Sequence, residues 1–167
     1  DPVDLDATTS QRFGKANVSG KIGVDYLRGG NLLYASYSRG YRAGSFAAQA
    51  FFAPDELTIA RPEKVDSFEA GFKLDLLGRK LRLNGAGFYY RYRDQQFIDV
   101  NPDGTQVLLN LPRSRIFGAE VELVARPTSS LSVSASLGLL DTRIIEGVVQ
   151  GQSVAGNRLS NAPALNL

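Results

Sequence analysis

The sequence predicts an all-β fold, an antiparallel meander of about six long strands joined by hairpins. Two observations predict it. Apolar and polar residues alternate with a period of two along several stretches, which places the two sets on opposite faces of a sheet. Short turn signals rich in Gly, Asn, Pro and Ser separate these stretches in pairs. No stretch approaches the roughly eighteen consecutive apolar residues of a transmembrane helix, so a helical membrane protein is excluded.

Three turn signals define the hairpins, at Arg28–Asn31, Leu77–Lys80 and Pro127–Ser130. Gly and Asn supply the positive φ that tight turns require, and Pro with Ser suits a slightly longer turn. Alternation is regular in every predicted strand except the fourth. The apolar face of these strands collects Ile22, Val24, Tyr26, Leu33, Ala35, Tyr37, Tyr41, Phe68, Ala70, Phe72, Leu74, Leu76, Phe117, Ala119, Val121, Leu123, Leu131, Val133, Ala135, Leu137 and Leu139. The third stretch also fits a helix, but Gly71 and Gly78 favour a strand.

The fourth strand, residues 81–97, is less regular. Ala86, Phe88, Tyr90 and Tyr92 are assigned to its apolar face, although Leu81 and Leu83 then fall on the opposite one. At about 3.3 Å per residue this strand reaches roughly 55 Å, which exceeds the usual length of strands in soluble proteins.

Short and long connections alternate along the whole chain, the long ones being residues 43–62, 98–113 and 141–160. A soluble β-sandwich has no such rule, whereas outer-membrane barrels combine short periplasmic turns with long extracellular loops. Aromatic residues gather toward the long-connection ends of the strands, as in the aromatic girdle of a membrane barrel. These residues are Tyr37, Tyr41, Tyr90, Tyr92 and Phe117. The sequence therefore favours the wall of a transmembrane β-barrel.

Charged residues concentrate on one face of the predicted sheet, which carries Lys21, Asp25, Glu69, Lys73, Asp75, Glu120 and Glu122. The other face is nearly free of charge, Arg39 being the clearest exception. A basic side chain that faces lipid at mid-depth costs about 2–4 kcal/mol, so the seven charged residues are predicted to face the barrel lumen. A soluble sandwich would show the same alternation with the two faces exchanged, and alternation alone does not decide between them.

Several function classes are excluded or disfavoured. The chain has no Cys and no His, which removes disulfides, thiolate metal sites and the commonest general base. No nucleophile motif is present, so we expect no enzyme activity, no cofactor and no metal site. Residues 99–104 imitate the start of a calcium loop, but an Asn-Pro-Asp-Gly turn explains them better. A net charge of +2 gives no indication of a nucleic-acid partner.

Five segments in order resemble TonB-dependent outer-membrane receptors. They are LLYASYSRGYR at 32–42, RPEKVDSFEAGFK at 61–73, GAGFYYRYRDQQF at 85–97, RIFGAEVELVARP at 115–127 and GNRLSNAP at 156–163. The resemblance covers about residues 13–165. It implies a barrel of about 22 strands in the outer membrane of a Gram-negative bacterium. Residues 1–167 are then expected to be an internal fragment of the barrel domain, without the plug domain and without the closing C-terminal strand.

The resemblance also implies a receptor that binds a scarce nutrient, most often a ferric siderophore, and imports it with energy delivered by TonB. The implied partners are outer-membrane lipid, the TonB complex acting through the plug domain, and the small nutrient itself. Because ferric siderophores often carry negative charge, Arg42, Arg61 and Arg143 near the long connections are candidate ligand-binding residues. The alternative function is a soluble β-sandwich module that binds carbohydrate or another ligand.

Overall fold

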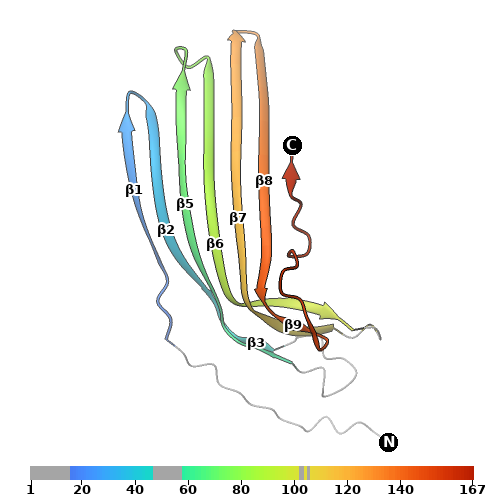
Figure 1. The fold of residues 1–167 in the computed structure, drawn as a ribbon. Helices are drawn as coiled ribbons and strands as arrows, with labels where there is room; N and C mark the ends of the chain where they lie inside the picture. Colours follow the sequence, from blue (N-terminus) through green and yellow to red (C-terminus); the bar gives the residue numbers. More distant parts are fainter. Residues whose placement is uncertain (1–15, 47–57, 102–103, 105) are drawn as a thin grey trace, which may run out of the picture.

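The computed structural model describes residues 16–46, 58–101, 104 and 106–167. Its main element is a seven-stranded sheet whose neighbouring strands are antiparallel and follow one another along the chain, as Figure 1 shows. The strands in sheet order are β1 (Gly20–Arg28), β2 (Asn31–Arg42), β5 (Glu63–Leu76), β6 (Leu81–Val100), β7 (Gln106–Thr128), β8 (Leu131–Glu146) and β11 (Leu165–Asn166). The predicted antiparallel meander is confirmed. The described residues contain no helix long and apolar enough to cross a membrane.

Two small two-stranded sheets accompany the main one. One pairs β3 (Ser45–Phe46) with β4 (Ile59–Ala60), and the other pairs β9 (Val148–Val149) with β10 (Gln152–Ser153). Both lie in connections at the same end of the main sheet, as Figure 1 shows. The chain after β10 turns back along β8, where the Leu140 N–H donates to the Ala164 carbonyl at 2.9 Å. At the other side of the sheet, β1 pairs with β2 alone.

The short turns lie where the sequence predicts them. Gly29 and Gly30 have φ of 59° and 85°, the pair of left-handed residues that a type I′ hairpin requires. In the second turn Gly78 has φ of 64°, and the Lys80 N–H donates to the Leu77 carbonyl at 3.3 Å. The third turn joins Thr128 to Leu131, which are cross-strand partners.

The predicted long connection at 98–113 is wrong, because most of it is strand. β6 and β7 extend to 20 and 23 residues and stay paired out to Val100 and Gln106. The pairing is interrupted at Asp94, which has φ of 52°. On β7 the corresponding unpaired residue is Pro112, which has no N–H to donate. The sheet bends there, and the outer part of the β6–β7 hairpin turns away from the main sheet in Figure 1. At its tip the Gly104 N–H donates to the Asn101 carbonyl at 2.9 Å, which fits a turn.

Register assigns every residue of the main sheet to one of two faces. Leu83 pairs with Leu74 and Leu123, so it belongs to the apolar face. Phe88 pairs with Glu69 and Gly118, so it belongs to the polar face. The predicted faces of the fourth strand are therefore wrong: Ala86, Phe88, Tyr90 and Tyr92 lie with the charged residues. Phe88 is accommodated there because its ring covers Gly118, where an added Cβ would collide with it.

The apolar face is not covered by a second layer in the described part of the chain. Ile22 is 72% exposed, Leu33 51% and Phe117 56%. The described buried hydrophobic residues are Ala60 in β4, Leu111 in the outer part of β7 and Ile144 near the end of β8, so all three lie toward the long connections. A sandwich requires its apolar face to pack against another sheet. The fold is therefore a single layer, and the sandwich alternative is wrong.

Candidate functional site

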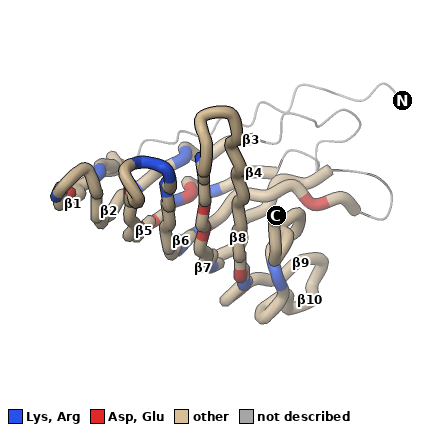
Figure 2. The backbone as a smooth tube through the Cα atoms, turned by 90° about the horizontal axis from the view of Figure 1, so that it is seen from above, with Lys and Arg blue, Asp and Glu red and all other residues tan. Residues whose placement is uncertain are grey.

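The seven charged residues predicted for the lumen share one face of the sheet. Cross-strand partners in antiparallel sheets lie on the same face, and continuous rows connect these residues with one another. One row runs from Asp25 through Tyr34, Gly71 and Ala86 to Glu120. The other members of the set lie two or four residues away from this row along their own strands and therefore on the same face: Lys21, Glu69, Lys73, Asp75 and Glu122. Figure 2 shows charged positions spread along these strands.

The polar face has its own local hydrogen bonds. The Arg82 guanidinium holds Asp75 through Nε at 2.8 Å and Nη2 at 3.3 Å. The Asn84 amide donates to Glu122 Oε2 at 2.9 Å, while Asn84 Oδ1 is buried without a hydrogen-bond partner among the described residues. A hollow beside these groups is also lined by Lys73 and Glu120, so both signs of charge meet in it. The hollow can accept a polar group from another part of the protein.

A polar cluster around the buried Gln96 ties together the bases of two long connections. Gln96 is 7% exposed, and its Nε2 donates to the carbonyls of Ala43 and Arg61, both at 2.9 Å. Asn110 accepts from the Arg61 N–H at 2.7 Å and donates to the Asp94 carbonyl at 2.7 Å. These bonds fix the bent part of β6 and β7 against the chain that enters β5. We call Arg61, Asp94, Gln96 and Asn110 the polar clamp.

The structure does not bring Arg42, Arg61 and Arg143 together. Arg42 is exposed on the polar face, across from Glu63. Arg61 belongs to the polar clamp and forms an ion pair with Asp94 at 2.6 Å. Arg143 lies on the opposite face, where its cross-strand partner is Arg115. The three residues therefore occupy three different surroundings.

Sequence reasoning missed the polar clamp and part of an aromatic row. The row crosses β2, β5, β6 and β7 on the apolar face and consists of Tyr37, Phe68, Tyr89 and Phe117, which are cross-strand neighbours. The rings of Tyr37 and Phe68 lie 5.0 Å apart, and the Tyr37 hydroxyl donates to Asp66 at 2.7 Å. Tyr37 and Phe117 were expected in this girdle, whereas Tyr90 and Tyr92 lie on the other face. Leu81 and Leu83, which lie on the apolar face, were the signal in the sequence that the two faces of the fourth strand had been exchanged.

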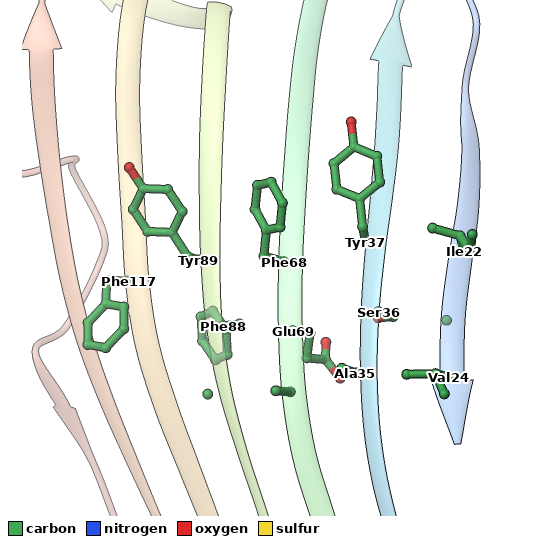
Figure 3. A pocket seen from close by; sticks show the side chains of 13 residues that line it. Ile22, Val24, Ala35, Ser36, Tyr37, Phe68, Glu69, Phe88, Tyr89 and Phe117 are labelled. Carbon is green, nitrogen blue, oxygen red and sulfur yellow. The ribbon is translucent and has the colours of Figure 1, made fainter. Parts of the chain in front are cut away.

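A shallow apolar hollow runs beside the aromatic row. Figure 3 shows Tyr37, Phe68 and Tyr89 side by side along it, with Phe117 on the next strand. Small residues form its floor: Ala35, Ala70 and Gly87 are successive cross-strand partners. The hollow therefore lies between larger side chains of the row above and the row below.

No group of three or more His, Cys, Asp or Glu residues capable of holding a metal ion occurs among the described residues. The described surfaces offer groups for non-covalent binding. One face offers apolar area, the other offers charges and hydrogen bonds, and the long-connection end offers exposed basic groups.

Several solved structures are similar to this chain. The siderophore receptor PiuA from Acinetobacter baumannii is 22% identical, with a TM-score of 0.62 over 88% of this chain and 22% of that one. The ferric yersiniabactin uptake receptor FyuA from Yersinia pestis is 19% identical, with a TM-score of 0.69 over 88% of this chain and 21% of that one. The ferric-catecholate import receptor Fiu from E. coli K12 is 21% identical, with a TM-score of 0.59 and the same coverage as FyuA.

At these identities the likeness establishes the fold, and this chain spans about a fifth of the length of each neighbour. The family described as "TonB dependent receptor-like, beta-barrel" matches residues 1–167. Family membership implies a barrel of about 22 strands, of which the seven-stranded sheet is one part of the wall. The order of strands, the exposed apolar face and the match over the whole sequence agree, and the chain belongs to the TonB-dependent receptor β-barrel family.

Proposed function

We propose that this chain forms part of the wall of an outer-membrane receptor that imports a scarce nutrient, with a ferric siderophore as the leading substrate class and TonB as the source of energy. The observation that carries the proposal is the single sheet with an exposed apolar face and a charged opposite face. In hydrocarbon the exposed apolar side chains are stabilising, and the charged face has to meet water or protein. This arrangement suits a barrel that encloses a plugged lumen.

The neighbours' names support the substrate class. PiuA, FyuA and Fiu are described as siderophore, ferric yersiniabactin and ferric-catecholate receptors, while another neighbour, OprC, is described as a copper transporter. Iron chelates are therefore the first class to test and free metal ions the second. The host would be a Gram-negative bacterium, and the long connections would face the outside.

The seven charged residues of the polar face would contact the plug domain and the water around it. Their neighbours Arg82 and Asn84 already satisfy Asp75 and Glu122. The other five, Lys21, Asp25, Glu69, Lys73 and Glu120, have no ion pair among the described residues. Among the candidate ligand residues, Arg42 is the strongest, because it is exposed on the polar face and forms no ion pair within the described residues. The role of Arg61 would be to position the connections through the polar clamp.

Uptake by the complete receptor tests the proposal. The receptor would be produced in a Gram-negative host that lacks its own siderophore receptors, and growth under iron limitation would be measured with a panel of ferric siderophores. We expect growth with at least one of them, dependent on the host's TonB. A protein that fractionates away from the outer membrane, or growth independent of TonB, would refute it.

A matched pair of variants tests Arg42. Arg42→Gln removes one cation near the long connections, and Arg28→Gln removes one at a short turn. Loss of one charge-assisted hydrogen bond should weaken ligand binding by about tenfold for Arg42→Gln. The Arg28→Gln receptor should bind as tightly as the wild type. Equal affinities for the two variants would remove Arg42 from the binding site.

A further inference from the structure

A group of basic residues lies on the apolar face, just beyond the aromatic row and toward the long connections. We call it the basic patch: Lys64, Arg91, Arg93, Arg113, Arg115 and Arg143. Two rows of the sheet compose it. Arg91, Arg115 and Arg143 are successive cross-strand partners on β6, β7 and β8. Lys64, Arg93 and Arg113 form the adjacent row on β5, β6 and β7.

Like charges directly opposite each other in a sheet are destabilising, so this arrangement requires compensation. Nearby carboxylates supply only part of it. Asp66 is shared between Arg39 at 2.7 Å and Arg93 at 3.8 Å. Glu146 pairs with Arg113 at 2.8 Å, and Asp141 lies 3.8 Å from Arg115.

The remaining cations have no such partner. Within the described residues, no ion pair involves Lys64, Arg91 or Arg143. The Nε of Arg115 is buried and has no hydrogen-bond partner there. An unsatisfied buried donor costs about 1–3 kcal/mol, so an acceptor supplied from outside the described chain would be stabilising.

The basic patch adjoins an apolar surface, so its surroundings favour a ligand that has both an anionic and an apolar part. On the side away from the long connections, the patch borders the aromatic row, and beyond that row lies the apolar hollow with its floor of Ala35, Ala70 and Gly87 (Figure 3). Aromatic rings mark the level at which hydrocarbon gives way to headgroups. Cations just beyond that level meet headgroup oxygens, and the guanidinium fork binds phosphate bidentately. A soluble anion would satisfy the arginines but would leave the hollow empty.

We propose that the basic patch binds the phosphate groups of a membrane lipid in the leaflet on the side of the long connections, while an acyl chain of the same lipid lies along the apolar hollow. This inference rests on the proposed membrane location. It adds a site with a defined chemistry: a lipid with at least one phosphate monoester, held by arginines from three adjacent strands. Arg143, considered above for nutrient binding, would serve this site.

The test uses the complete receptor, purified in detergent and stripped of lipid. Binding would be followed by native mass spectrometry during titration with bisphosphorylated lipid A, monophosphorylated lipid A and phosphatidylcholine. We expect the affinity to fall in that order. Equal affinity for the three lipids would overturn the proposal, because the hollow alone would then account for binding. Inorganic phosphate alone is the second probe, and saturation at millimolar phosphate without lipid would show a simple anion site instead.

Two variants of equal charge change identify the residues. The first is the triple variant Arg91→Gln, Arg115→Gln and Arg143→Gln. The control removes three cations at the short-turn end through Arg28→Gln, Arg79→Gln and Lys80→Gln. The patch variant should bind bisphosphorylated lipid A at least tenfold more weakly, and the control should bind within twofold of the wild type. Equal loss in both variants would overturn the proposal.

Folding and nutrient uptake are separated from lipid binding. If the triple variant fails to fold, the single change Arg143→Gln, at an exposed residue without a described ion pair, replaces it with an expected threefold loss. Arg143→Gln binding the lipid as tightly as the wild type would then refute the patch. Lipid binding is measured on the purified receptor and does not depend on nutrient uptake. Absence of uptake by the wild-type receptor would therefore refute the proposed substrate class without affecting the lipid site.

Discussion

Leu137 and Ser136 are neighbours on β8 that lie on opposite faces of the sheet. Leu137 pairs with Val121 in the middle of the apolar face, and Ser136 pairs with Glu122 on the polar face. Replacing each residue by Arg adds the same charge at nearly the same depth. The two variants place the same guanidinium on opposite faces of the sheet.

The magnitudes follow from the two surroundings. An Arg that faces lipid near the middle of the membrane costs about 2–4 kcal/mol. At about 1.4 kcal/mol per tenfold, this corresponds to roughly a 30- to 700-fold change in the folding equilibrium of Leu137→Arg. Ser136→Arg places its charge beside Glu122, in surroundings that already contain Lys73 and Asn84. Its expected effect is within about 1 kcal/mol, since an exposed ion pair contributes little.

The assay is unfolding of the complete receptor by guanidinium chloride in lipid vesicles. Unfolding is monitored by far-UV circular dichroism and by the electrophoretic mobility of unheated samples. The quantity compared is the free energy of unfolding of the two variants. Equal destabilisation, or a larger loss for Ser136→Arg, would mean that the apolar face does not contact lipid. The assignment of the two faces would then be reversed.

Two further predictions concern packing and the aromatic row. Gly118→Val should destabilise the barrel by about 1–3 kcal/mol, because its Cβ would collide with the Phe88 ring. Gly138→Ala should be tolerated, since the nearest atom to an added Cβ there is 3.7 Å away. Chemical denaturation of the two variants checks this prediction. Asp66→Ala should cost about 1–3 kcal/mol, because it leaves the Tyr37 hydroxyl and Arg39 without their acceptor. Asp141→Ala, which removes only an exposed 3.8 Å contact, should cost less than about 0.5 kcal/mol, and equal losses in the two would contradict the role given to Asp66.

The fold class was predictable because both of its signals are local. A period of two and a Gly-Gly turn are properties of a few consecutive residues, and β1, β2 and the turn at Gly29 follow from them. The family resemblance added the membrane barrel, and the match over residues 1–167 confirmed it.

The faces of β6 were not predictable in the same way. Phe88, Tyr90 and Tyr92 outweigh Leu81 and Leu83 in any count of apolar residues, so the strand was assigned the wrong parity. The deciding contact is between Phe88 and Gly118, thirty residues later, and only the register reveals it. Large aromatic residues on a polar face are tolerated where a glycine opposite leaves room for the ring.

The candidate site was predicted only at the level of faces. The seven charged residues are on one face, as period-two counting requires, but the surroundings of each arginine depend on partners distant in sequence. Arg61 meets Asp94 and Asn110, and Arg143 meets Arg115, through pairings that no local pattern encodes. The alternation of charges along one strand therefore indicates orientation but does not identify a ligand site.

The one-sided pairing of β1 has a consequence for how the receptor is assembled. Along its outer edge, the backbone N–H and C=O groups of Gly20–Arg28 have no strand partner among the described residues. In hydrocarbon each unsatisfied backbone group costs several kcal/mol, so an open sheet edge is not stable there. In the proposed membrane location, insertion and ring closure must then be coupled: this wall can lie in a bilayer only once further strands complete the barrel. Machinery that delivers the receptor to the membrane would have to shield the edge of β1 until that final pairing occurs.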